Sequence, residues 1–435
     1  MGDKVPQRCF DDILVNRADF YWVFLLMILA SPKERLAEFL QSLPFSVAEL
    51  PDEACLVGGA VRDALLQRQS DYIDFDFVLP EKAVETARDI AKKYHAGFVV
   101  LDEARQIARV VFRQGTLDFA LQEGGSLERD LRRRDYCANA IAYHIRSNSL
   151  VDPLNGLADL ENRVLRMVTP ENLADDPLRL LRAYRQAAQL GFRLDGATRH
   201  QIQRLAPLIK NIAAERVQHE LNYLLRHRDG DRWLALAFQD GLFSHWLPGA
   251  DQISLERAQG LTNICATFAQ VYPQFTEEPD WLALAKLACL VGTDPEKAHQ
   301  AIACLKYSRH ELRTIGLVLE MLPQLLRAAD QPLNLREQYF FFQSTKDTFP
   351  TLALVAQGFG LPSGTIEPLL KRYFTPQDPV AHPVPLLSGK DLIRELHLSP
   401  SPQIGQLLTE IQIAHIEGKV RNKAEAIAWG RDYLC

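Results

Sequence analysis

The sequence predicts a two-part fold: an α/β head built on a small mixed sheet, followed by an all-α remainder. Short apolar runs typical of strands fill residues 54–152 and are interrupted by two helical patterns. From Asp175 onward, one amphipathic helical pattern follows another and few β-rich runs remain. The 435 residues are enough for about two to four domains with sizeable cores.

At the N-terminus, the apolar run 20–30 needs an explanation. It is too short to span a bilayer and no small-residue cleavage site follows it, so a core or interfacial helix is favoured over a cleaved signal peptide. Alternatively, residues 1–26 are upstream sequence and translation begins at Met27, directly before a polar helix over 31–42. Both starts, Met1 and Met27, stay open.

The remaining elements follow from periodicity and turn residues. Strands are expected at residues 54–57, 73–79, 97–101, 108–112, 116–121, 138–145 and 149–151. Helices are expected first at 60–67, 81–94 and 127–133, then at 176–190, 196–208, 214–226 and 231–239. A Pro-rich stretch over 375–385 predicts a loop before a last helical unit at 389–433.

Charge and cysteine content restrict the kind of partner and the cellular compartment. The net charge is −6, so a nucleic-acid partner would have to meet locally concentrated basic residues. Seven cysteines are scattered, odd in number and without metal-binding spacing. This is typical of a reducing cytosol and a cytoplasmic protein, and it excludes a zinc site of CxxC type.

The first chemical signal is Gly58-Gly59, which stands between an apolar strand and a helix. Glycines at such a turn let phosphate oxygens approach backbone N–H groups. Asp74 and Asp76 then alternate along a strand, so both carboxylates point to one face. A phosphate cradle and paired carboxylates indicate a metal-bound nucleoside triphosphate. A solvated amphipathic strand is the alternative.

A third carboxylate, Asp118, weakens that alternative because it also lies between apolar residues on a predicted strand. Three carboxylates on one sheet face repel one another unless cations lie between them. Two Mg²⁺ ions held by Asp74 and Asp76 would relieve the repulsion and clamp the attacking and leaving oxygens of a transfer reaction. Asp118 would then help to activate a 3′-hydroxyl.

Basic residues supply candidate phosphate contacts. Arg62 would face the phosphates while Asp63 orients it, although a surface ion pair is the alternative. For the arginine cluster that begins at Arg129 and ends at Arg134, the alternative is a solvated helix face. Asn139 lies in an apolar strand, and a buried amide needs partners, which a ribose or base could supply.

The last cluster is Asp176, Arg179, Arg182 and Arg185. Asp176 before Pro177 is also a good helix N-cap, which is the structural alternative. Cytosine and adenine each present an exocyclic amine beside a ring-nitrogen acceptor. One carboxylate beside one guanidinium would accept these bases and reject uracil and guanine by leaving buried groups unpaired. Arg182 and Arg185 would remain for stacking or the triphosphate.

These motifs occur in an order that resembles the class II tRNA nucleotidyltransferase and bacterial poly(A) polymerase family. The matching segments begin at Gly58, Asp74, Arg133, Asp152 and Asp175; weaker matches follow at Glu215 and, in the tail, at Ser388. The resemblance implies a polymerase-β-like nucleotidyltransferase head over residues 31–152, a helical neck over 153–228, a body over 229–350 and a tail over 351–435, after an extension over 1–30. It also implies that Gly59, Arg62 and Arg134 bind the nucleotide together with the Asp176 cluster.

Two departures from the family pattern matter. The usual Glu-Asp of the selecting motif is Asp175-Asp176 here. Complete CCA-adding relatives carry a long flexible loop between the positions of Asp118 and Arg133, whereas only residues 119–132 remain here, with a Gly124-Gly125 turn. Within the family, loss of this loop marks enzymes that add CC and stop. The loop acts as a lever that lets the pocket change from C to A.

The resulting hypothesis is CC addition to tRNA from CTP, with the terminal A left to a separate enzyme. The alternatives are a full CCA-adding enzyme that also uses ATP, an A-adding enzyme, and a poly(A) polymerase. An enzyme that transfers a nucleotide to a small molecule would share the Gly-Gly and Asp-x-Asp motifs, but it would not need the long helical remainder. A non-catalytic RNA-binding protein would not need all three carboxylates.

Overall fold

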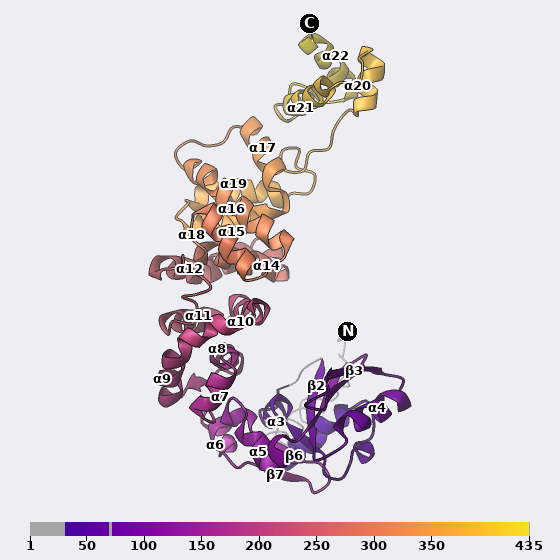
Figure 1. Cartoon of the computed structure of the whole chain (residues 1–435). Coiled ribbons are helices and arrows are strands. Elements are labelled where there is room, and N and C mark those ends of the chain that lie inside the picture. The colour runs from indigo at the N-terminus through magenta and orange to yellow at the C-terminus, as the bar shows by residue number, and fades with distance from the viewer. Residues whose placement is uncertain (1–30, 69–71, 435) are drawn as a thin grey trace, which may run out of the picture. The chain divides into compact units, whose positions relative to one another are not determined.

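The computed structural model describes residues 31–68 and 72–434 (Figure 1). It divides into two compact units, one formed by Met1–Arg179 with Leu190–Leu205 and the other by Leu180–Gln189 with Ala206–Cys435. The boundary passes through helix α8 (Leu178–Leu190). The four-part division into head, neck, body and tail stays a prediction. The apolar run 20–30 and the choice between Met1 and Met27 lie outside the described residues.

The head is built on a seven-stranded mixed sheet in the order β3-β4-β5-β2-β1-β6-β7. Only β2 and β5 run parallel; the other neighbouring pairs are antiparallel. The strands are β1 (Cys55–Val57), β2 (Ile73–Leu79), β3 (Gly97–Asp102), β4 (Ile107–Phe112), β5 (Gly115–Leu121), β6 (Ala142–His144) and β7 (Ser149–Val151).

Apolar alternation explains the two central strands. Phe75 and Phe77 of β2 and Phe119 of β5 are buried, and the rings of Phe77 and Phe119 stack with centroids 5.2 Å apart. Helix α4 (Ala83–Lys93) packs its buried stripe, which includes Ala87 and Ile90, against β4 and β5. The polar residues of β2 are therefore left on the exposed side.

The prediction of one strand over residues 138–145 is wrong. Only β6 is extended, and Cys137–Asn139 form a 3-10 turn, η4. The backbone here pairs elsewhere: the N–H of Cys137 donates to the carbonyl of Arg166 (2.9 Å). Helix α6 (Gly156–Glu161) packs against η4 so closely that a Cβ on Gly156 would lie 2.3 Å from the Cys137 carbonyl oxygen. Apolar residues at this point thus reflect burial, not a strand.

The other elements of the first unit are mostly helical. Ser31 and Glu34 form a capping box at the start of α2. The elements are α2 (Pro32–Phe39), α3 (Gly59–Leu65), α5 (Leu127–Arg132), α7 (Pro170–Asp175), α9 (Gly196–Leu205) and the short strands β8 (Val164–Leu165) and β9 (Arg193–Leu194).

The second unit is all-α in the part of the chain that the structure describes, as the sequence predicted. Its helices after α8 are α10 (Ala214–Arg226), α11 (Gly230–Gln239), α12 (Gln252–Ala269), α13 (Gln274–Glu277), α14 (Pro279–Leu290), α15 (Pro295–Cys304), α16 (Arg309–Arg327), α17 (Leu335–Thr345), α18 (Phe349–Gly358), α19 (Ser363–Phe374), α20 (Gly389–Leu396), α21 (Pro402–Ile416) and α22 (Lys423–Leu434).

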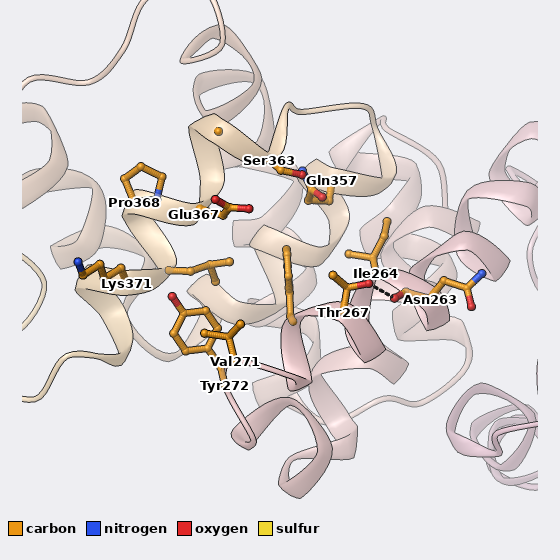
Figure 2. A pocket seen from close by; sticks show the side chains of 13 residues that line it. Asn263, Ile264, Thr267, Val271, Tyr272, Gln357, Ser363, Glu367, Pro368 and Lys371 are labelled. Atoms are coloured by element: carbon orange, nitrogen blue, oxygen red, sulfur yellow. Dashed lines mark hydrogen bonds between the residues drawn. The ribbon is translucent and has the colours of Figure 1, made fainter.

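A cavity of about 900 Å³ lies within this unit, between α12 and α19 (Figure 2). Tyr272, Glu367 and Lys371 contribute to its lining. None of the residues predicted to bind the nucleotide or the metal lines it.

No helix among the described residues combines the length and the apolar character that crossing a membrane requires. The five cysteines that the structure describes are free thiols, four of them buried.

Candidate active site

The register of β2 and β5 brings the three predicted carboxylates together. Asp76 lies directly opposite Asp118, and Asp74 lies opposite Thr116. Asp74 and Asp76 are both exposed, on the side of β2 that faces away from the buried Phe75. Because residues directly opposite in a sheet share a face, one acidic surface carries all three side chains. Alternation along the strands predicted this arrangement.

Each carboxylate has a different environment. Asp118 is held by the Arg109 guanidinium of β4 through two hydrogen bonds, from Nε (2.7 Å) and Nη2 (2.8 Å). Asp74 accepts a hydrogen bond from the Thr116 hydroxyl (3.0 Å). Asp76 has no hydrogen-bond donor among the described residues.

Loss of water contact raises the pKa of Asp76, and the neighbouring carboxylates add to that rise. Although the side chain keeps an exposed face, the protein packed around it displaces enough water to raise the pKa of Asp76 to about 6. The Arg134 guanidinium opposes this rise in pKa, while the charges of Asp118 and Asp74 add to it. A cation on this face would remove the repulsion.

The residues fit a divalent cation that arrives with phosphate. Within residues 31–68 and 72–434, no cluster of three His, Cys, Asp or Glu side chains is arranged as a ready-made metal site. Arg109 instead occupies both oxygens of Asp118. Asp74 and Asp76 remain, and Mg²⁺ is commonly held by one or two carboxylates together with substrate phosphates and water. The pair therefore suits Mg²⁺ brought by a triphosphate.

The glycine turn lets the Arg134 guanidinium and the Asp76 carboxylate approach the backbone at the edge of this surface. Gly58 has a φ of +75° and precedes α3. A Cβ at Gly58 would lie 2.9 Å from Nη1 of Arg134 and 3.3 Å from Oδ2 of Asp76. The Nε of Arg134 is buried and has no hydrogen-bond partner among the described residues. An unsatisfied buried donor beside a carboxylate-rich face points to an anionic ligand.

Arg62 lies beneath the turn and is held by the protein. Its Nε and Nη2 donate to the Asp63 carboxylate (3.0 and 2.8 Å), so Asp63 does orient it, as predicted. Its Nη1 donates to the Asn139 side-chain oxygen (2.7 Å). Arg62 is buried, which excludes a surface ion pair. A Cβ at Gly59 would lie 3.5 Å from Arg62 Nη2.

Asn139 differs from its prediction in two respects. It lies in η4 and not in a strand. The protein supplies partners for its amide, since its Nδ2 donates to Asp135 (2.9 Å) and its oxygen accepts from Arg62. In this structure Asn139 therefore connects Arg62 to Asp135.

The connection after β5 is short and folded. β5 ends at Leu121 and α5 begins at Leu127, so five residues, 122–126, join them. Gly124 and Gly125 both have positive φ, 72° and 75°, which confirms the tight turn. The Glu123 N–H and the Arg133 guanidinium both bond to the buried Asp130 carboxylate.

The predicted selecting residues lie where α7 meets α8. Oδ1 of Asp176 accepts a hydrogen bond from the Leu178 N–H (3.4 Å), which is consistent with a role as a helix cap. Arg179 is half-buried, and its Nη1 donates to the carbonyls of Arg133 (2.9 Å) and Asn172 (3.0 Å). Hydrogen bonds thus hold both Asp176 and Arg179, and both residues belong to the first unit.

Arg182 and Arg185 belong to the second unit. Arg182 is half-buried. Arg185 is bound to the buried Glu220 of α10 and lies over the Tyr223 ring, 5.6 Å from its centroid. Glu220, the partner of Arg185, thus lies in the segment that begins at Glu215 and weakly matches the family pattern.

Sequence reasoning missed Arg109, Asp130 and Thr116. An arginine among the apolar residues of β4 could have been detected, because alternation and antiparallel pairing place it opposite Asp118. Asp130 is flanked by arginines, and such a charge run is typical of a solvated helix face, yet Asp130 is fully buried.

Sheet topology, acidic face and glycine turn together define a nucleotidyltransferase of the polymerase type. Comparison with protein families agrees: residues 54–166 match the Poly A polymerase head domain, 191–253 the probable RNA and SrmB-binding site of polymerase A, and 275–429 tRNA nucleotidyltransferase domain 2. The chain belongs to the tRNA nucleotidyltransferase and poly(A) polymerase family.

Individual relatives cover nearly the whole chain. It is 50% identical over 411 residues, 92% of this chain and 98% of the relative, to a CC-adding tRNA nucleotidyltransferase of Synechocystis sp.. An A-adding tRNA nucleotidyltransferase of Deinococcus radiodurans is 32% identical, over 87% of this chain and 95% of the relative. The solved CCA-adding enzyme of Thermotoga maritima, complexed with tRNA, shares the fold at a TM-score of 0.71 and 21% identity, over 92% and 98% of the two chains.

Proposed function

We propose that this enzyme uses CTP to add two cytidylates to the 3′ end of tRNA and then stops. The observation that carries the proposal is the five-residue connection between β5 and α5, closed by Gly124-Gly125. By family resemblance, a flexible lever occupies this place in enzymes that switch from C to A. A connection this short and this extensively hydrogen-bonded leaves no segment to move. The name of the relative at 50% identity supports the same product.

A full CCA-adding enzyme, an A-adding enzyme and a poly(A) polymerase are the alternatives. The relative at 32% identity is named as an A-adding enzyme, so similarity at that level does not decide the product. Asp176 beside Arg179 offers an acceptor and donors to the amine edge that cytosine and adenine share, which rejects uracil and guanine without choosing between C and A. By the family resemblance, such a pocket accepts C first. A pocket without its lever keeps that first preference.

The roles of the head residues follow from their geometry. Asp74 and Asp76 would hold Mg²⁺, which when bound neutralises the triphosphate and lowers the pKa of the attacking 3′-hydroxyl. Arg134 would direct its unsatisfied Nε to a phosphate oxygen. Asp118, positioned by Arg109, would orient the hydroxyl.

The remaining predicted contacts support the nucleotide. Gly58 and Gly59 leave the space that side chains would fill. Arg62 and Asn139 form a buried pair that stiffens this turn. Arg182 and Arg185 are proposed to bind the nucleotide on the basis of the family resemblance alone.

The biological setting is part of the proposal. A tRNA that lacks its 3′ CCA is the acceptor, CTP the donor, and a separate A-adding enzyme completes the end. We place the enzyme in the cytoplasm, where its free cysteines would stay reduced.

Incubating the protein with a tRNA that lacks its 3′ end, in the presence of CTP, ATP or both, tests the proposal. We expect a product longer by two nucleotides whenever CTP is present, with no further growth on addition of ATP. A product ending in CCA would replace CC addition with complete CCA addition. Growth with ATP alone would favour the A-adding or poly(A) alternative.

A further inference from the structure

The short connection after β5 is attached to the arginine cluster by side-chain contacts. Oε2 of Glu123 forms an ion pair with Nη1 of Arg133 at 2.9 Å. The Glu123 N–H also donates to Oδ1 of Asp130 (3.3 Å). Arg129 closes the turn from the other side by donating to the Gly124 carbonyl (3.0 Å). The connection is therefore a braced segment rather than a loose loop.

Asp130 is the buried centre of this brace. Its Oδ1 accepts hydrogen bonds from Nε and Nη2 of Arg133 (3.2 and 3.1 Å), and its Oδ2 accepts one from Nη2 of Arg134 (3.2 Å). The Asp130 side chain is 0% exposed, whereas those of Arg133 and Glu123 are 39% and 35% exposed. A buried carboxylate with several charge-assisted bonds fixes the positions of its donors.

The same arginine fixes the selecting residue through its backbone. The Arg133 carbonyl accepts a hydrogen bond from Nη1 of Arg179 at 2.9 Å, and the Asn172 carbonyl accepts a second at 3.0 Å. The Tyr136 hydroxyl holds the Arg179 backbone by donating to its carbonyl (2.6 Å). A continuous path of contacts thus runs from Glu123 through Arg133 to Arg179, wholly within the first unit.

We infer that Glu123 and Arg133 are positioning residues for base selection: they lock Arg179 in the orientation that reads cytosine. The inference rests on the proposed function and extends it. A site rejects the wrong base only if its donors cannot move to pair with it. One N–H group of Arg179 is held by two carbonyls, which directs the rest of the guanidinium. Releasing Arg133 would let Arg179 tilt and admit the larger adenine.

The test compares four single substitutions in the full-length enzyme: Arg133→Ala, Arg133→Lys, Glu123→Gln and, as the control, Arg132→Ala. The double variant Glu123→Gln/Arg133→Ala is added. Arg132 is adjacent and equally charged, but its side chain pairs with Glu128 on the surface of α5. For each variant, kcat/KM is measured separately for CTP and ATP on the same tRNA lacking its 3′ end, together with Tm.

We expect the ratio of kcat/KM for CTP to that for ATP to fall about tenfold in Arg133→Ala, the scale of one lost charged hydrogen bond. Glu123→Gln should lower the ratio less, and Arg132→Ala should leave it at the wild-type value. The double variant Glu123→Gln/Arg133→Ala should equal Arg133→Ala, because both changes remove one shared interaction. Arg133→Lys should recover part of the ratio.

An unchanged ratio in a folded Arg133→Ala variant would overturn the inference. This holds whether both kcat/KM values stay at the wild-type level or fall equally, and an equal fall would indicate a merely structural role. If Arg133→Ala fails to fold, Glu123→Gln decides: its partly exposed side chain makes it tolerable, and an unchanged ratio there also overturns the inference. Cytidylate addition by the wild-type enzyme tests the proposed function separately. If it adds no cytidylate, the proposed function fails, whatever the variants do.

Discussion

At the scale of single residues, Gly58 is where the site has no room for a side chain. Its φ of +75° already disfavours other residues, and a Cβ would lie within 2.9 Å of Arg134 Nη1. The atom it meets is the end of a flexible side chain, so the fold can adapt. The ψ of Gly58, −136°, lies outside the left-handed helical region, so we expect Gly58→Ala to cost about 1–3 kcal/mol of stability from backbone strain. Displacing Arg134 should in addition lower kcat/KM for CTP by about ten- to a hundredfold.

Gly191→Ala is the matched control for this prediction. Gly191 also has a positive φ, +65°, but nothing lies within 4 Å of its Cβ position. Gly191→Ala should lose stability through backbone strain and keep wild-type kinetics. Steady-state incorporation of CTP together with thermal unfolding separates the two effects. Equal kinetics in the two variants would remove Arg134 from the nucleotide site.

Which site residues could be read from the sequence depends on what holds them. Asp74, Asp76 and Asp118 were predictable because strand alternation alone sets the direction of each side chain. The partners of Asn139 and Arg185 were not, because Arg62 and Glu220 meet them only through tertiary packing. Arg109 falls between these cases, since its place opposite Asp118 follows from the pairing of β4 with β5.

At the scale of elements, too, the sequence predicts what a local pattern determines and misses what tertiary packing determines. The bounds of β2 and β7 agree with the sequence pattern to the residue, because turn residues flank a clear strand signal. Residues 138–141 were assigned to a strand because apolar runs do not distinguish strands from other buried segments. Packing of α6 against this segment decided its conformation instead.

In the tail, Asp391 at the start of α20 connects this helix to α22. Asp391 and Ser388 form a capping box, and Oδ1 of Asp391 also accepts a hydrogen bond from Nζ of Lys423 at the start of α22 (2.6 Å). The Lys423 and Ser388 hydrogen bonds lower the pKa of Asp391 well below its usual range. A carboxyl with a depressed pKa in the folded state stabilises above its unfolded pKa and loses that contribution as pH falls.

Asp391→Asn should therefore destabilise the tail at neutral pH. The difference from wild type should shrink as pH falls below about 4, the ordinary pKa of an aspartate. Hydrogen exchange of peptides from residues 388–434 measures the opening of this small core, which includes Leu392, Leu407 and Ile411. A difference that stays constant down to pH 3 would show that the Asp391 charge does not contribute.

At the scale of the whole molecule, an acidic protein is proposed to bind an acidic polymer. The net charge of −6 comes from 55 acidic and 49 basic residues. Long-range attraction is therefore unavailable, and local contacts between arginine or lysine and phosphate must supply the affinity. Each such contact releases counterions from the tRNA, so the logarithm of the association constant should fall linearly with the logarithm of salt concentration, with a slope of about −0.7 to −0.9 per phosphate.

Asp74→Ala separates this binding from the chemistry. Asp74 lies on the acidic face of the head, and its loss removes a proposed metal ligand without removing any basic residue. Incorporation of CTP should fall to background. The affinity for tRNA and its salt slope should both stay close to wild type, as measured by filter binding between about 50 and 200 mM salt, the range in which such slopes are resolved. Retained incorporation would remove Asp74 from the catalytic set. A flat salt dependence would instead show that phosphate contacts do not provide the affinity, and that tRNA is recognised through its bases or its shape.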